Sequence, residues 1–216
     1  MCEADGTGEA TILIGLNLPN QITVARLVMA IIFFVLLAPY EAAEPNPQLL
    51  DVCAALFIVA ALSDIVDGYL ARKHNQVTPL GRILDPFVDK ILTIGAYIFL
   101  AGDGFVDGAG VKVSDVADWM VVVILGRELL VTSLRGVTEA AGQSFGANWH
   151  GKLKMLLQSV TVVWVLLTVA HPDFFEFFTR LRPLMVWLTV IVTVLSVFSY
   201  LWAARSVLSQ TPVSDT

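Results

Sequence analysis

Long apolar runs recur along the chain at regular intervals and dominate its pattern. They cover residues 22–38, 49–66, 87–100, 119–134, 153–170 and 184–204. Each run approaches the roughly 20 residues that a helix needs to cross the hydrocarbon core of a bilayer. The stretch 31–37 is apolar on every side, which suits a spanning helix and not the alternating strands of a barrel. The pattern predicts six transmembrane helices and no β-barrel.

The composition supports this prediction. Of the 216 residues, 56% are hydrophobic and only 15% are charged, with a mean hydropathy of +0.76, whereas soluble domains contain about 25% charged residues. A soluble domain of this size has too little interior for so many apolar side chains. We therefore expect an all-α integral membrane protein with an N-terminal tail (1–20), one membrane domain (21–206) and a C-terminal tail (207–216).

Charged residues predict the orientation and exclude one class of partner. A net charge of −6 and a pI near 4.9 argue against nucleic-acid binding, which needs a basic surface. If the N-terminus is cytoplasmic, only Lys112, Arg180 and Arg182 of the 13 basic residues fall on the outer side. Because short cytoplasmic loops carry the excess of Lys and Arg, both termini are predicted to be cytoplasmic.

Four aspartates at the boundary of the second and third runs form the clearest chemical pattern. The chain reads Asp64-x2-Asp67-Gly68-x2-Ala71-Arg72-x8-Gly81-x3-Asp85-x3-Asp89. Spacings of three and four residues place each aspartate pair on one helix face. Carboxylates at a membrane boundary are energetically costly, and crowded anions without compensation take up protons. Divalent cations compensate for them, and oxygen ligands favour Mg²⁺, Mn²⁺ or Ca²⁺ over zinc.

Small and basic residues in the same pattern suit a phosphate ligand. Two cations could clamp the oxygens of a phosphodiester during in-line displacement. Gly68 and Ala71 leave room for a ligand, Gly81 allows a turn before the third helix, and Arg72 could neutralise a phosphate. A single Asp pair at a helix end is usually a solvated cap, but eight specified residues in 26 positions favour a site.

This pattern resembles the CDP-alcohol phosphotransferase signature at every fixed position. The resemblance implies a homodimeric six-helix membrane enzyme with a polar cavity open to the cytoplasm. In such enzymes an alcohol displaces CMP from a CDP-linked donor, with two divalent cations, which we expect to be Mg²⁺ with Mn²⁺ as the alternative. It assigns Asp64, Asp67, Asp85 and Asp89 as metal ligands, Asp89 also as the catalytic base, and Gly68, Ala71, Arg72 and Gly81 to the CDP-diacylglycerol site.

A second group of basic residues bears on the acceptor alcohol. Arg127-Glu128-x6-Arg135, Gly151-Lys152-x-Lys154-x3-Gln158 and the segment Asn17 to Arg26 resemble the phosphatidylglycerophosphate synthases of this family. The resemblance implies CDP-diacylglycerol as donor and sn-glycerol 3-phosphate as acceptor, in the cytoplasmic membrane of a bacterium. We expect the acceptor phosphate to bind at Arg127, Arg135, Lys152 and Lys154.

Other interpretations remain open at this point. Lys152 and Lys154 could be membrane anchors on the cytoplasmic side, and Arg127 could simply pair with Glu128. Inositol phosphate, serine or phosphatidylglycerol could replace glycerol 3-phosphate as acceptor. An ion transporter would also carry intramembrane carboxylates, although the acids cluster at one boundary and no inverted repeat is evident.

Overall fold

The described residues fold into a bundle of six α-helices, one for each apolar run. The structure is a computed structural model that describes residues 18–74, 79–140 and 149–208. Its side chains are described except at 18–20, 64–74, 79–83, 139–140, 149–152, 203–204 and 206–208. The described elements are α1 (Leu18–Leu37), α2 (Pro47–His74), α3 (Pro79–Ala101), a short 3₁₀ helix η1 (Asp103–Phe105), α4 (Asp118–Ala140), α5 (Trp149–Ala170) and α6 (Glu176–Leu208).

Most helices extend beyond the apolar runs that predict them. Helix α2 continues eight residues past Val66 to His74, and α3 begins at Pro79, where the fixed φ of proline suits a first helical position. The aspartate pattern therefore lies on two helices rather than in a connection. Gly81 lies inside α3, so the expectation that it makes the turn before the third helix is wrong.

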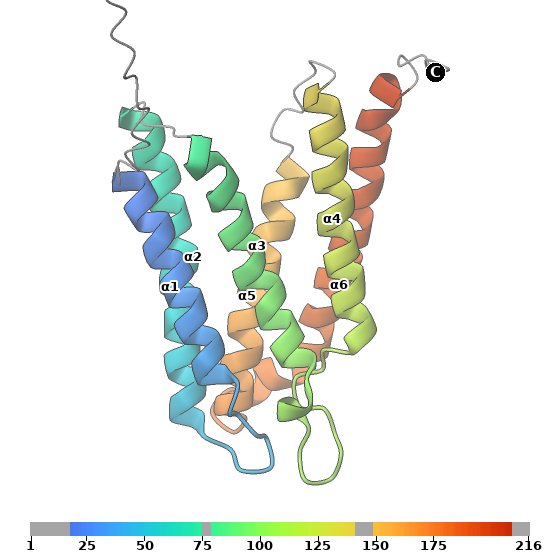
Figure 1. Cartoon of the computed structure of the whole chain (residues 1–216). Coiled ribbons are helices and arrows are strands. Elements are labelled where there is room, and N and C mark those ends of the chain that lie inside the picture. The colour runs from blue at the N-terminus through green and yellow to red at the C-terminus, as the bar shows by residue number, and fades with distance from the viewer. Residues whose placement is uncertain (1–17, 75–78, 141–148, 209–216) are drawn as a thin grey trace, which may run out of the picture.

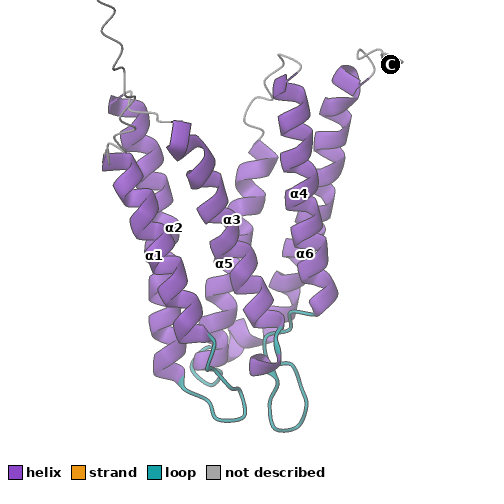
Figure 2. Cartoon of the chain, in the orientation of Figure 1, coloured by secondary structure: helices purple, strands orange, loops and turns teal. Residues whose placement is uncertain are grey.

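Helices from both halves of the chain pack against one another, and the two ends of the bundle differ. Helix α1 packs against α2 and α3, α2 against α5, α5 against α6, and α6 against α4. The loops 38–46, 102–117 and 171–175 lie together at the bottom in Figures 1 and 2, which we call the loop end. The helices converge there and spread at the other end, where α2 ends and α3 begins (Figure 1). We call this the motif end.

Contacts between segments distant in sequence hold the loop end together. Arg182 of α6 donates a hydrogen bond to Asp115 of the α3–α4 loop at 2.6 Å. The backbone N–H of Ala42 donates to the carbonyl of Gly104 at 2.8 Å. The α1–α2 loop, the α3–α4 loop and α6 are thereby connected to one another.

The start of α6 differs from the prediction. The last apolar run begins at residue 184, so the sequence predicts a connection before it, but α6 begins at Glu176 and includes Pro183. Glu176 and Arg180 form an ion pair one turn apart at 2.5 Å, which supports a helix. Charges at the water boundary therefore extend this helix instead of ending it.

Polar residues face inward on α6 and large apolar residues face outward. The buried polar positions recur at spacings of four, three and four residues and are Thr189, Thr193, Ser196 and Tyr200. Phe198 and Trp202 between and beyond them are 65% and 80% exposed. A water-soluble helix shows the reverse distribution. The outer surface of the bundle therefore suits an apolar solvent.

Helix length leads to the same coarse conclusion. Within the described residues, Leu153–Ala170 and Glu176–Trp202 are long and apolar enough to cross a membrane. The apolar stretches Gln21–Leu37 and Pro47–Ser63 are shorter. Together with the inverted polarity of α6, these segments are consistent with a membrane protein.

Candidate active site

The signature residues lie on two neighbouring helices. Asp85 and Asp89 are one turn apart on α3, as their spacing predicts. The signature residues on α2 are Asp64, Asp67, Gly68, Ala71 and Arg72. The side chains of these five and the surroundings of Gly81 lie outside the described part of the structure, so their assigned roles stay predictions.

Helix α1 brings two buried polar side chains to the signature. The Thr23 hydroxyl donates a hydrogen bond to Asp85 Oδ1. Arg26 is fully buried, and its Nε donates to the hydroxyl of Ser63, the residue before Asp64, at 3.3 Å. Both residues belong to the segment Asn17 to Arg26, and the structure places Thr23 beside Asp85 and Arg26 beside Ser63.

The donor chemistry at this position fits hard divalent cations. Among the described residues no cluster of three or more His, Cys, Asp or Glu side chains occurs, but this set excludes the carboxylates of Asp64 and Asp67. Asp85 accepts one hydrogen bond from Thr23, and an ionised carboxylate offers about four lone-pair sites. Asp85 can therefore ligate a cation while Thr23 fixes its orientation, and carboxylate oxygens are the ligands that Mg²⁺ and Mn²⁺ prefer.

A buried cluster of charged residues joins α4 and α5. Glu128 Oε1 accepts hydrogen bonds from Arg127 Nη1 at 3.0 Å and from Lys154 Nζ. Arg127, Glu128 and Lys154 are only 7%, 8% and 5% exposed. Burial of this extent does not suit a headgroup anchor for Lys154. Arg127 does pair with Glu128, as one of the open interpretations held. Two cations share one carboxylate, so the trio keeps one positive charge.

Helix α6 adds two residues to this cluster. Arg127 Nε donates to Ser196 Oγ at 2.8 Å. The centroid of the Tyr200 ring lies 5.1 Å from Cζ of Arg127 and 5.6 Å from Cζ of Arg135. The structure thus brings together Arg127, Arg135 and Lys154 from the predicted acceptor site, while the Lys152 side chain lies outside the described residues.

One atom of the cluster lacks a partner. Arg127 Nη2 is buried and has no hydrogen-bond acceptor among the side chains and backbone that the structure describes. A buried donor left without a partner is unfavourable by about 1–3 kcal/mol, more when it is charged. The atom is therefore available to an anionic ligand.

The two groups of residues are close enough to interact. Next to Asp89, the ammonium of Lys90 donates to Thr132 Oγ1, and Thr132 donates to the backbone carbonyl of Glu128 at 2.7 Å. The carboxylates of α3 and the basic cluster of α4, α5 and α6 therefore form one polar region at the motif end.

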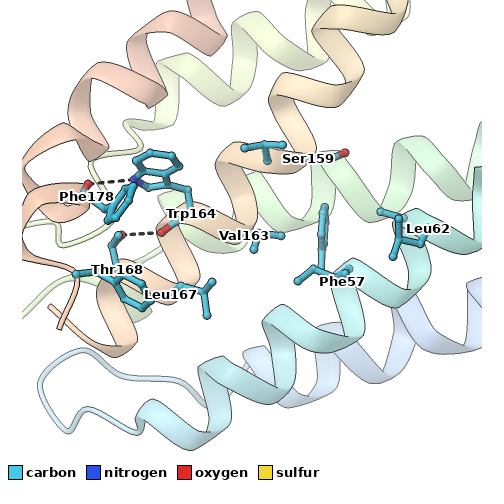
Figure 3. Close-up of a pocket in the computed structure, with 12 residues that line it drawn as sticks. Phe57, Leu62, Ser159, Val163, Trp164, Leu167, Thr168 and Phe178 are labelled. Carbon is cyan, nitrogen blue, oxygen red and sulfur yellow. Dashed lines mark hydrogen bonds between the residues drawn. The ribbon is translucent and has the colours of Figure 1, made fainter.

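An apolar groove lies between α2 and α5 (Figure 3). It has a volume of about 360 Å³, and its walls are almost entirely apolar. Phe57 and Leu62 of α2 face Val163 and Leu167 of α5 across it. At its loop end, Trp164 Nε1 donates to the carbonyl of Phe178 at 3.0 Å. Leu62 is only two residues from Asp64, so the groove runs along the same helix as the signature.

Comparison with known proteins decides the family. The family model described as CDP-alcohol phosphatidyltransferase matches residues 16–195, which is most of the chain and includes every candidate site residue. The chain belongs to this family. It is accordingly a transferase, and the resemblance seen in the signature is confirmed.

Curated relatives of this phosphatidyltransferase are similar over most of their length. A Bacillus subtilis protein named CDP-diacylglycerol–glycerol-3-phosphate 3-phosphatidyltransferase is 38% identical over 191 residues, covering 85% of this chain and 93% of its own. A Rickettsia bellii protein of the same name is 31% identical, covering 88% and 96%. A probable phosphatidylglycerophosphate synthase of Mycobacterium tuberculosis is 35% identical, covering 72% and 68%.

Proposed function

We propose that this phosphatidyltransferase transfers the phosphatidyl group of CDP-diacylglycerol to sn-glycerol 3-phosphate, giving phosphatidylglycerol phosphate and CMP. The observation that carries the proposal is the hydrogen-bonded link from Lys90, the neighbour of Asp89, through Thr132 to Glu128. It joins the signature helix α3 to a basic cluster with a guanidinium donor that has no acceptor among the described residues. A phosphorylated acceptor needs both groups in one site. The names of the relatives support the same substrates.

The donor occupies the signature side of the site in this proposal. Asp64, Asp67, Asp85 and Asp89 hold two divalent cations, while Gly68, Ala71, Arg72 and Gly81 surround the CDP group. When bound, the cations would stabilise the negative charge on the donor phosphates and on the departing CMP. Thr23 keeps Asp85 oriented through its hydrogen bond.

The acceptor occupies the basic side. Arg127 Nη2, Arg135, Lys152 and Lys154 bind its phosphate, which leaves its primary hydroxyl near Asp89. The Asp89 carboxylate takes the hydroxyl proton as the oxygen bonds to the phosphorus of the phosphatidyl group. The bond from that phosphorus to the CMP oxygen breaks, and CMP leaves with the electron pair.

The membrane arrangement follows from the same proposal. We place all six helices across the cytoplasmic membrane of a bacterium, with both termini and the motif end on the cytoplasmic side. Ten of the 13 basic residues then lie near the cytoplasm, in accordance with the positive-inside rule. The protein acts as a homodimer among membrane lipids.

A panel of acceptors tests the function. Purified protein with labelled CDP-diacylglycerol and Mg²⁺ is expected to release CMP with glycerol 3-phosphate and to form labelled phosphatidylglycerol phosphate. Inositol phosphate, serine and phosphatidylglycerol serve as competing acceptors. If one of these acceptors gives product and glycerol 3-phosphate gives none, the proposed acceptor is wrong. No CMP with any alcohol would favour the transporter interpretation instead.

The apolar groove is proposed to hold an acyl chain of the donor. It adjoins the signature on α2 and is lined by apolar side chains, and its volume falls within the roughly 300–1,000 Å³ of ligand sites. Val163→Trp fills the groove and is expected to raise the KM for CDP-diacylglycerol about tenfold, because overpacking displaces the chain. The KM for glycerol 3-phosphate should stay within about twofold.

A matched variant separates groove filling from a general effect of tryptophan. Val35→Trp on α1 makes the same change at a position that is 66% exposed and lies outside the groove. It should leave both KM values unchanged. Equal donor KM values for the two variants would place the acyl chains elsewhere.

A further inference from the structure

Tyr200 contacts both arginines of the proposed acceptor site. It lies on α6, is 2% exposed, and its ring contacts both guanidinium groups. Its hydroxyl also accepts a hydrogen bond from Arg135 Nη2 at 3.3 Å. Arg127 and Arg135 are eight residues apart on α4, a rise of about 12 Å along the helix. A single ring therefore contacts two side chains whose Cα atoms are about two helical turns apart.

Tyr200 differs from Glu128 in its effect on the charge of the cluster. Glu128 binds Arg127 and Lys154 but cancels one positive charge. An aromatic ring attracts a guanidinium through its negative face and carries no net charge. Tyr200 can therefore hold Arg127 and Arg135 near each other, against their mutual repulsion, without reducing the positive charge that a phosphate would meet.

The remaining contacts of Arg127 agree with such a role. Its Nε donates to Ser196, whose own proton is donated to the carbonyl of Thr193 at 2.7 Å. Its Nη1 donates to Glu128, and Nη2 has no acceptor among the described residues. With two sides of the guanidinium occupied and one face on the Tyr200 ring, only the Nη2 side remains for a ligand.

We propose that Tyr200 is a positioning residue for the acceptor. It sets the separation of the Arg127 and Arg135 guanidinium groups so that both bind the phosphate of the acceptor alcohol, which favours phosphorylated over neutral acceptors. This inference rests on the proposed function, because it takes glycerol 3-phosphate as the acceptor.

Two substitutions at this position test the inference. Tyr200→Leu removes the ring and is expected to raise the KM for glycerol 3-phosphate about tenfold, which corresponds to about 1.4 kcal/mol and lies within the range of a single cation–π contact. The KM for CDP-diacylglycerol and kcat should stay within about twofold. Tyr200→Phe keeps the ring and loses one hydrogen bond, so its acceptor KM should rise only about two- to threefold.

Control variants separate positioning from packing. Tyr40 is also buried but lies at the loop end, where the centroids of its ring and the Phe105 ring are 4.7 Å apart. Tyr40→Leu should leave the acceptor KM unchanged. Arg135→Ala removes one of the positioned groups and should raise the acceptor KM at least as much as Tyr200→Leu. If Tyr200→Leu does not fold, the test depends on Tyr200→Phe, which should raise the KM for glycerol 3-phosphate and leave the KM for CDP-diacylglycerol unchanged.

The contrary outcomes are distinct. An unchanged acceptor KM in both Tyr200 variants, with a raised value in Arg135→Ala, would overturn the role of Tyr200 and leave the proposed function intact. Equal changes in kcat and in both KM values would overturn it in favour of core packing. A wild-type enzyme that does not use glycerol 3-phosphate would overturn the proposed function, and this inference with it.

Discussion

The Asp89→Asn variant is expected to bind CDP-diacylglycerol but to turn it over at least about a thousandfold more slowly than the wild type. An amide cannot accept the proton of the acceptor hydroxyl, and loss of a general base alone lowers rates by about 10²–10⁴-fold. The lost negative charge also weakens cation binding. Single-turnover release of CMP at saturating Mg²⁺, with donor binding measured separately, tests this prediction.

The control for Asp89→Asn is the same change at the opposite end of the bundle. Asp51 lies on α2 near the loop end, where it contacts His171 at 3.0 Å. Asp51→Asn should retain near-normal turnover. A near-normal rate in Asp89→Asn would show that another group accepts the proton, and loss of donor binding would show that Asp89 acts mainly in holding the donor.

Removal of divalent cations is expected to abolish activity at least as completely. In the proposed site, EDTA would remove the charge that compensates the four signature carboxylates, and the uncompensated carboxylates would repel the donor phosphates. Added Mg²⁺ should restore turnover, and the comparison with Mn²⁺ identifies the better cation. Asp85→Ala should require a higher Mg²⁺ concentration for half-maximal activity. Full activity in EDTA would contradict the proposed cation site.

The number of helices could be predicted from the sequence, but their ends could not. Each of the six apolar runs marks one helix, because a helix that faces an apolar solvent needs apolar side chains over most of its length. The boundaries at His74, Pro79 and Glu176 lie in polar sequence, where hydropathy gives no signal. There the helices continue through local ion pairs, such as Glu176 with Arg180, and through tertiary contacts such as Arg182 with Asp115.

The candidate site was predictable where it depends on helical spacing. Asp85 and Asp89 lie on the same face of α3 because they are four residues apart. The contact of Arg127 with Ser196 joins residues 69 positions apart in the chain, and no local pattern reveals such a pair. A partial signal existed on α6, since polar residues at spacings of four, three and four in an apolar helix indicate a buried polar face. Read in this way, Ser196 and Tyr200 would have been candidates.

Hydrogen bonds at the loop end hold the helices to one another there. Helices α3 and α4 each contain 23 residues, which corresponds to a length of about 35 Å. A change of about 5° in the angle between them, pivoting at the loop end, would displace the far ends by about 3 Å. The spacing of the helix ends around the candidate site would therefore depend on the angle at the loop end, and a substitution in the Arg182–Asp115 contact would change it from the opposite end of the bundle.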